Sequence, residues 1–163
     1  MENKENSKKS FMAKNKLEKI YSTSLPSGYR FTEFRPGDEN NWAYIQYSAG
    51  AFKDYQLAVR AVFKEVDKFR REFSKRCTFL ENENGERIGT VMVLPSATEE
   101  IGVQEIKYLA IVPKYQGQGF GKVLISKAYK IVNDIEGATR INLEADNDKS
   151  VGFFENLGFE KLG

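Results

Sequence analysis

A glycine-rich stretch, Tyr115-Gln-Gly-Gln-Gly-Phe-Gly-Lys122, constrains the fold of this chain more than any other segment. The apolar run before it, residues 108–113, is typical of a buried strand, and the periodic apolar run after it, residues 123–132, is typical of a helix. Glycine permits positive φ and a close approach of the backbone to another group. A glycine turn at a helix N-terminus presents free N–H groups and the positive end of the helix dipole. The stretch therefore predicts a binding site for a phosphate group.

Three kinds of glycine loop compete for this stretch. A Walker A loop requires Ser or Thr after its lysine, whereas Val123 follows Lys122. A Rossmann fingerprint reads G-x-G-x-x-G directly after the first strand of a domain. The spacing here is G-x-G-x-G, late in the chain, and only Glu144 is placed to act as the ribose-binding acid. The third alternative is an ordinary glycine-rich turn, which the cluster favours when it is taken alone.

The composition limits the kinds of protein this chain can be. Its 163 residues suffice for one domain with its own core. The net charge is +2, with acids and bases interspersed, so the sequence has no basic region of the kind that binds nucleic acid or an anionic membrane. No apolar stretch approaches the ~20 residues of a membrane span, and the N-terminus lacks a signal-peptide core. We therefore expect a cytoplasmic protein that binds neither nucleic acid nor membrane.

The available side chains limit the chemistry. Cys77 is the single cysteine, which excludes an internal disulfide, suits a reducing compartment and predicts a buried filler of the core. The chain has no histidine, which removes imidazole triads, histidine bases and histidine-ligated zinc. We expect no metal, and acid–base chemistry must use Glu, Asp, Tyr, Lys, Cys or water.

The pattern of apolar residues predicts a flexible N-terminal arm, residues 1–15, and a single domain, residues 16–163. Helices are expected from Asp38, as the N-cap, to about residue 48, and at 54–75, 123–132 and 149–156. Strands are expected at 17–23, 29–34, 77–80, 87–94, 102–112 and 140–145. Strands first pair locally and then alternate with helices, which predicts a mixed sheet in an α/β (α+β mixed) fold.

Residues 108–122, together with a later Asn147 and the sequence Phe154-Glu-Asn-Leu-Gly158-Phe159, resemble the GCN5-related N-acetyltransferase (GNAT) superfamily. The family's loop, [RQ]-x-x-G-x-[GA], corresponds to Gln116, Gly119 and Gly121. The resemblance extends over roughly residues 29–159 and is most specific from 105 to 159. It implies a central mixed, mostly antiparallel sheet flanked by helices, with strands that splay apart at the cofactor site.

The resemblance also implies how acetyl-CoA is bound. Its pyrophosphate is expected on backbone N–H groups of the loop, namely Gly117, Gln118, Gly119, Phe120, Gly121 and Lys122. The pantetheine is expected to pair in strand fashion with Leu109, Ala110 and Ile111, because its amides can replace missing ladder partners. The thioester carbonyl can then accept a backbone N–H. Asn147 occupies a family position that supports the cofactor, and it suits a helix N-cap equally well.

Two glutamates are candidates for the base that deprotonates an acceptor amine, whose pKa is near ~10. Glu105 shares a strand face with Leu109 and matches the position where protein-acetylating members carry their base. Glu144, at the end of the next strand, resembles the base of the ribosomal-protein branch. The alternative for each glutamate is a solvated carboxylate at a strand end.

Phe154 is the main departure from the family pattern. Many members carry a tyrosine at this position, which protonates the departing CoA thiolate. Phenylalanine keeps the packing and removes the proton, although a thiol with a pKa of ~8.5 is already a fair leaving group. Tyr108, Tyr115 or water could supply the proton. Phe154 thus favours one alternative to an N-acetyltransferase, a non-catalytic acyl-CoA-binding or regulatory module.

The acceptor is expected to be a primary amine on a small molecule or peptide. Aromatic side chains gather in the two N-terminal helices, and one or two of them should line its cleft: Trp42, Tyr44, Tyr47, Phe52 and Tyr55. The chain ends soon after Gly158-Phe159, where the family usually continues with one or two strands. Either the chain is shortened, or the N-terminal segment or a second subunit covers that sheet edge, so a homodimer is one expectation.

Overall fold

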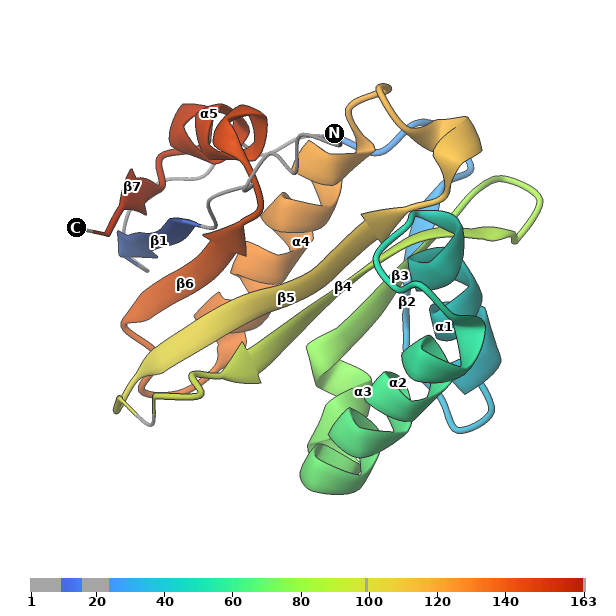
Figure 1. Cartoon of the computed structure of the whole chain (residues 1–163), viewed down its shortest axis with the longest axis horizontal. Coiled ribbons are helices and arrows are strands. Elements are labelled where there is room, and N and C mark those ends of the chain that lie inside the picture. Colours follow the sequence, from blue (N-terminus) through green and yellow to red (C-terminus); the bar gives the residue numbers. More distant parts are fainter. Residues whose placement is uncertain (1–9, 16–23, 99, 163) are drawn as a thin grey trace, which may run out of the picture.

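A computed structural model describes residues 10–15, 24–98 and 100–162. They form a seven-stranded sheet in the order β2-β3-β4-β5-β6-β1-β7 (Figure 1). The parallel pair is β5–β6, and the other neighbouring strands run antiparallel. The strands are β1 Ser10–Asn15, β2 Arg30–Glu33, β3 Cys77–Glu81, β4 Arg87–Pro95, β5 Val103–Ile111, β6 Arg140–Ala145 and β7 Glu160–Lys161. The expected mixed, mostly antiparallel sheet is confirmed.

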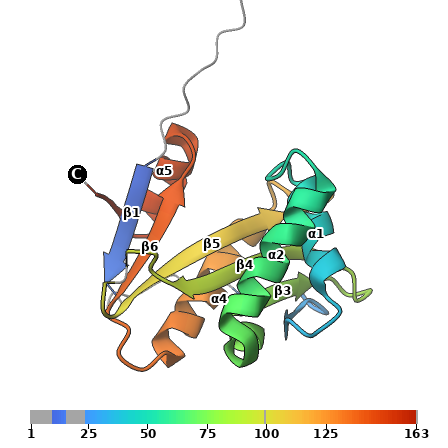
Figure 2. The ribbon, with the colours of Figure 1, turned by 60° about the horizontal axis from the view of Figure 1, so that its bottom comes forward.

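Helices cover both faces of the sheet. Helix α1 (Glu39–Ser48) packs on β4 and β5, and α2 (Tyr55–Phe69) packs against α1 on the same face, away from β6 and β1 (Figure 2). Helix α4 (Phe120–Asp134) crosses the other face, over β4 and β5. A fifth helix, α5 (Asp148–Asn156), packs with α4 in the same core cluster. None of the helices in the described part of the chain is long and apolar enough to cross a membrane.

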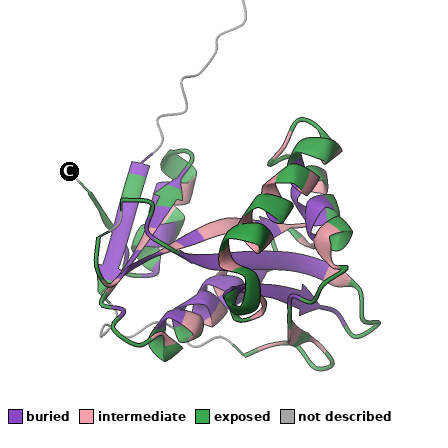
Figure 3. Cartoon of the chain, turned by 90° about the horizontal axis from the view of Figure 1, so that it is seen from below, coloured by how far each residue is buried: buried purple, intermediate pink, exposed green. Residues whose placement is uncertain are grey.

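The alternation of side chains along the strands separates two cores. Val91 and Val93 of β4 face α4, whereas Met92 and Leu94 face α1 and α2. Figure 3 shows the centre of the sheet buried and the outer faces of the helices exposed. Cys77 lies in the second core as a free thiol, and burial raises its pKa to about 12, which confirms its expected role as a filler.

Three predictions about the N-terminal half require correction. Residues 10–15 are not a flexible arm but strand β1, which lies between β6 and β7 and covers the edge of β6. Residues 1–9 and the strand predicted at 17–23 lie outside the described residues. The helix predicted over 54–75 ends at Phe69, because Arg70 has a φ of 44°, and a 3-10 turn η1 (Arg70–Glu72) and a short helix α3 (Phe73–Arg76) follow.

The predicted cap of α1 is the third correction. Asp38 precedes the helix, but its carboxylate makes no cap bond to the helix. It accepts from the backbone N–H of Arg35 at 2.8 Å and pairs with the Arg87 guanidinium at 2.5 Å instead. The carboxylate therefore ties the loop before α1 to strand β4.

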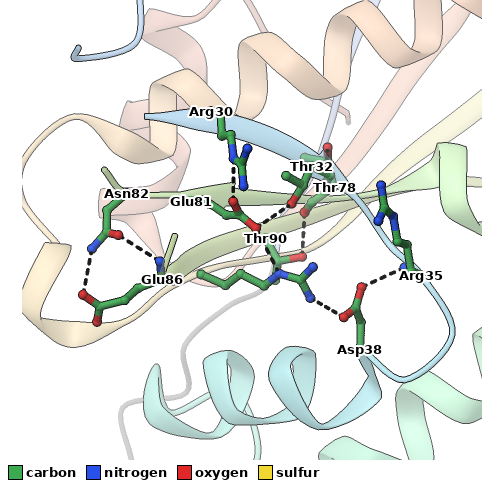
Figure 4. A network of polar contacts seen from close by, with 10 residues as sticks. Arg30, Thr32, Arg35, Asp38, Thr78, Glu81, Asn82, Glu86 and Thr90 are labelled. Carbon is green, nitrogen blue, oxygen red and sulfur yellow. Dashed lines mark hydrogen bonds and ion pairs between the residues drawn. The ribbon is translucent and has the colours of Figure 1, made fainter. Parts of the chain in front are cut away.

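Asp38 belongs to a polar network that joins β2, β3 and β4 (Figure 4). Glu81 lies at its centre, buried, and accepts from Arg30 at 2.7 Å, Thr32 at 3.3 Å and Arg87 at 3.5 Å. Burial by itself raises the pKa of Glu81, but the hydrogen bonds and charges of the two arginines outweigh it and hold the pKa below its usual value. The network therefore stabilises the sheet as long as Glu81 is ionised.

We expect Glu81→Gln to lower the free energy of unfolding by about 1–3 kcal/mol at neutral pH, because Arg30 loses its charged partner and Arg87 keeps only Asp38. The folded-state pKa is depressed, so this stabilisation is complete above the unfolded pKa of ~4.3 and is lost as pH falls through the folded pKa. Urea denaturation at pH 7 and at pH 3–4 measures both. Glu83→Gln, on the exposed hairpin, is the matched control. An equal loss in both variants would contradict the role of the network.

Candidate functional site

A cavity of about 740 Å³ lies where β5 and β6 separate. The two strands pair only from Val103 to Ile106 and from Arg140 to Leu143, and beyond this point they diverge (Figure 1). Residues from both faces of the sheet line the cavity, so it extends between the strands. The lining includes Gln46, Phe52, Glu105, Tyr108, Leu109, Ile125, Asn142, Glu144, Ser150 and Phe154.

The second half of β5 is bonded to a strand on one side only. Ala110 and Ile111 pair with Thr90 and Gly89 of β4, but the ladder with β6 has already ended at Ile106. Backbone groups that point away from β4 therefore face the opening between the strands. Buried N–H and C=O groups require partners, so this segment can bind an extended ligand that carries amides.

The β4–β5 ladder is irregular at Tyr108. Thr90 pairs with Ala110 and Met92 with Lys107, so that two residues, Tyr108 and Leu109, lie opposite the single residue Val91. Tyr108 has a φ of 58°, a conformation that residues with a Cβ rarely adopt. The bulge lies at the wall of the cavity.

The glycine stretch forms an open turn between β5 and α4. The helix begins at Phe120, three residues before the predicted start, with Gly119 as its N-cap. Gly117 and Gly119 have φ values of 74° and 87°, and nothing lies within 4 Å of the point where a Cβ would be. The turn therefore leaves room for a ligand beside the N–H groups at the start of α4.

The side chains of Gln116 and Gln118 stabilise the turn by hydrogen bonds to backbone carbonyls. The Gln116 amide donates to the carbonyl of Ile111 at 2.8 Å, and the Gln118 amide donates to the carbonyl of Lys114 at 3.2 Å. The Phe120 ring is buried and stacks on Tyr29 at a centroid distance of 5.3 Å. Lys122 is half-buried. Because the Phe120 ring is buried, Phe120 can contact a ligand at this site only through its backbone.

Both candidate bases lie at the cavity. Glu105 is half-buried and accepts from the Ser96 hydroxyl at 3.1 Å and from the Ala97 N–H at 3.3 Å. Glu144 is exposed on β6, opposite Phe11 of β1. Asn142 lies beside Glu105 in the β5–β6 ladder, and its buried Oδ1 has no hydrogen-bond partner. This wall of the cavity thus presents two carboxylates and one unsatisfied acceptor.

Asn147 and Phe154, the two site residues predicted at helix α5, differ in their position relative to the cavity. Asn147 caps α5, where its side chain accepts from the N–H of Ser150 at 2.9 Å, and it is not among the residues that line the cavity. Phe154 does line the cavity, with 8% of its surface exposed, and contacts Phe153 and Phe159 edge to face. The N-cap role of Asn147 is therefore confirmed, and support of the cofactor, which is compatible with that role, stays a prediction.

Of the two tyrosines considered as proton donors, only Tyr108 lines the cavity. Burial raises the pKa of its phenol, and the carboxylate of Glu65 raises it further, so the hydroxyl remains protonated at neutral pH. The Tyr115 hydroxyl instead accepts from the Asn82 amide at 2.9 Å, outside this lining. The position of Tyr115 therefore argues against a role in proton transfer.

Of the five aromatic residues expected near the acceptor, Phe52 lines the cavity. Trp42 is buried, Tyr44 and Tyr47 are exposed outside the lining, and the Tyr55 hydroxyl donates to Asn40 at 3.1 Å. Sequence reasoning missed Gln46, Arg140 and Asn142. A signal for Gln46 was present, because it is a polar residue on the buried side of α1.

A model of the Acetyltransferase (GNAT) family matches residues 31–159 of this chain. The chain is similar to the mycothiol acetyltransferases of Streptomyces griseus and Streptomyces avermitilis, with 27% and 30% identity over 137 and 139 residues. These alignments cover 83% of this chain and 44% of each relative. The chain therefore spans less than half the length of these relatives.

Solved structures of the same family share the fold. A GCN5-related N-acetyltransferase from Sphaerobacter thermophilus has a TM-score of 0.75 at 15% identity, over 94% of this chain and 48% of that one. The ribosomal-protein-S18-alanine N-acetyltransferase from Escherichia coli has a TM-score of 0.62 at 20% identity, over 83% and 79%. The resemblance stated from the sequence is confirmed. Because the family model covers most of its length, this chain belongs to the acetyltransferase (GNAT) family.

Proposed function

We propose that this chain transfers an acetyl group from acetyl-CoA to a primary amine. The observation that carries the proposal is the cavity between β5 and β6, which joins an open glycine turn, a strand segment bonded on one side and two carboxylates. Membership of the acetyltransferase (GNAT) family supports the same reaction. Among the described residues no group of three or more metal-ligating side chains occurs, and the proposed reaction uses none.

The positions of the glycine turn and of β5 support one placement of the cosubstrate. We place the pyrophosphate on the N–H groups of residues 117–122, where open space and the helix dipole favour an anion. We place the pantetheine along Leu109, Ala110 and Ile111, whose outward backbone groups lack a partner strand. Acetyl-CoA supplies an activated carbonyl carbon as a thioester.

Glu105 is the base that we propose for the acceptor amine. Ser96 and Ala97 hold one oxygen of its carboxylate, which leaves the other oxygen to accept a proton from the ammonium group. The freed amine attacks the carbonyl carbon, a C–N bond forms and the C–S bond breaks. The thiolate that leaves takes a proton from the Tyr108 hydroxyl or from water, since Phe154 has none to give.

The acceptor approaches, in our proposal, over the part of the sheet that α1 and α2 leave uncovered. Three carboxylates line this side of the cavity, from Glu100, Glu105 and Glu144. Two cations, Lys107 and Arg140, lie there as well, and the Arg140 guanidinium is paired with Glu100 at 2.8 Å. Two relatives carry the name mycothiol acetyltransferase, a name that supports a small-molecule acceptor here. We also propose a cytoplasmic location, supported by the single, buried, unpaired cysteine.

A second candidate function is a non-catalytic acyl-CoA-binding module. It is favoured by Phe154, which leaves this position of α5 without the hydroxyl that the family pattern carries there. The two functions share the glycine turn and differ in what Glu105 does. A variant in the turn therefore tests the binding of CoA, and a variant at Glu105 tests catalysis.

Gly121→Asp tests whether an anion lies against the start of α4. A Cβ at this position would lie 3.6 Å from Phe153 and 3.9 Å from Ile111, which are ordinary contacts, and an acidic residue in the first turn suits the helix dipole. We expect the unliganded protein to remain folded, while the Kd for CoA rises by about tenfold or more, because the added carboxylate repels the pyrophosphate.

Gly152→Asp in α5 is the matched control, because a Cβ there meets nothing within 4 Å. Isothermal titration with CoA should give an unchanged Kd for this variant. Equal affinity of the wild type and Gly121→Asp would exclude the proposed position of the pyrophosphate. Absence of acetyl-CoA binding to the wild type at millimolar concentration would overturn both candidate functions.

Glu105→Gln tests catalysis. Loss of a general base lowers a rate by about 10²–10⁴-fold, and we expect kcat to fall by this amount while the Kd for acetyl-CoA stays within about twofold. CoA release with a panel of diamines, aminoglycosides, amino acids and peptides measures the rate. A thiol reagent can report it, because Cys77 is buried.

Glu144→Gln and the exposed Glu136→Gln complete this experiment. Glu136→Gln should behave as the wild type. A large loss in Glu144→Gln with none in Glu105→Gln would assign the base to Glu144. Acetyl-CoA binding without CoA release for any amine of the panel would favour the non-catalytic module.

A further inference from the structure

The side chain of Gln46 joins helix α1 to the bulge of strand β5. Gln46 is 1% exposed, and its Nε2 donates to the carbonyl of Tyr108 at 2.7 Å. We propose that Gln46 is a positioning residue for acetyl transfer, which fixes the peptide group between Tyr108 and Leu109 at the wall of the cavity. The inference rests on the proposed function and extends it to a residue that does not touch the reacting atoms.

The bulge requires such support. Tyr108 has a φ of 58°, and a conformation of this kind costs on the order of 1–3 kcal/mol for a residue with a Cβ, so it persists only where the surroundings hold it. Two aromatic rings hold its side chain: Trp42 at 5.2 Å, edge on, and Phe52 at 6.4 Å, stacked. Gln46 holds its backbone. All three residues come from α1 or from the segment that follows it.

The hydrogen bond from Gln46 also sets the direction of a neighbouring donor. The carbonyl of Tyr108 and the N–H of Leu109 belong to one trans peptide group, and in a planar trans peptide they point in opposite directions. A carbonyl held towards α1 therefore directs the Leu109 N–H away from α1. Leu109 lines the cavity where we place the pantetheine, so this N–H is available to stabilise negative charge that develops on the oxygen of the thioester at the end of the pantetheine.

Gln46 further links the bulge to the acceptor side of the cavity. Its own backbone carbonyl accepts from the N–H of Ala51 at 3.0 Å, and this bond shapes the connection between α1 and α2. Ala51 and Phe52, in that connection, line the cavity. One buried residue thus orients both the peptide that would contact the thioester and the wall that faces the acceptor.

Gln46→Met tests the proposal, because methionine has a similar length and no N–H donor. We expect kcat to fall by about 10–100-fold, less than or similar to the loss of a direct oxyanion donor, while the Kd for CoA, which has no acetyl group, stays within about twofold. Gln56→Met, at an exposed position of α2, is the matched control and should change neither quantity.

Gln46→Glu provides a second variant of the same shape. Its carboxylate cannot donate at neutral pH, but its protonated form can, so its kcat relative to that of the wild type should recover as pH falls towards ~5. Unchanged kcat in Gln46→Met would overturn the proposal. So would a loss of kcat accompanied by an equal loss of CoA affinity, which is the result of a purely structural role.

The wild-type measurements separate this proposal from the function on which it rests. If the wild type binds CoA and releases it from acetyl-CoA with an amine, the Gln46 variants alone decide the role of Gln46. If the wild type neither binds nor transfers, the proposed function is wrong and the role of Gln46 is overturned with it.

Discussion

The separation of β5 from β6 is the constraint on which the rest of this structure depends. A parallel pair that ends at Ile106 and Leu143 leaves the remainder of β5 with a partner on one side only. Unpaired backbone groups inside a protein are costly, so the opening needs an occupant that carries amides of its own. The glycine turn lies at the end of the same strand and adds free N–H groups for an anion. A ligand with both an anionic and an amide-bearing part satisfies both regions together.

The remainder of the sheet holds this opening in place. On one side, the network around Glu81 fixes β2, β3 and β4 to one another and to the loop before α1 (Figure 4). On the other side, β1 pairs along the whole of β6, from Ser10 opposite Ala145 to Asn15 opposite Arg140. On the side that faces away from the opening, β5 is therefore hydrogen-bonded to β4 and β6 to β1. The strands can separate because neither depends on the other for most of its hydrogen bonds.

Most elements could be predicted from the sequence because their apolar periodicity is strong. Residues 140–145 alternate as a strand does, and residues 87–94 end in a continuous apolar run typical of a strand buried on both faces. The three glycines before residue 123 predicted the turn and the helix that follows. Strand β1 could not be predicted in this way, because Ser10–Asn15 mixes polar and apolar residues without a regular alternation and becomes a strand through its pairing with β6. The end of α2 at Phe69 depends on the positive φ of Arg70, which no local pattern indicates.

The sequence predicted the backbone segments of the candidate site better than the side chains that line it. The turn and the strand segment 109–111 were identified because glycines and a buried apolar run have distinct patterns. Gln46 on α1 reaches the cavity from an element far in the chain from β6, which supplies Arg140 and Asn142. The polar side chains of Arg140 and Asn142 carry no signal of their own in a single sequence. The cap at Asn147 was expected from the sequence, whereas the partner of the Tyr115 hydroxyl, Asn82, lies 33 residues away and no local pattern indicates it.

Hydrogen–deuterium exchange with and without saturating CoA tests the central claim most directly, because it reports where the cosubstrate meets the backbone. If CoA binds in the opening between the strands, amide exchange should slow in residues 108–111 and 117–122 and remain unchanged in the hairpin at 82–86. Protection confined to other segments, or no protection at a CoA concentration that saturates binding, would contradict the proposed site.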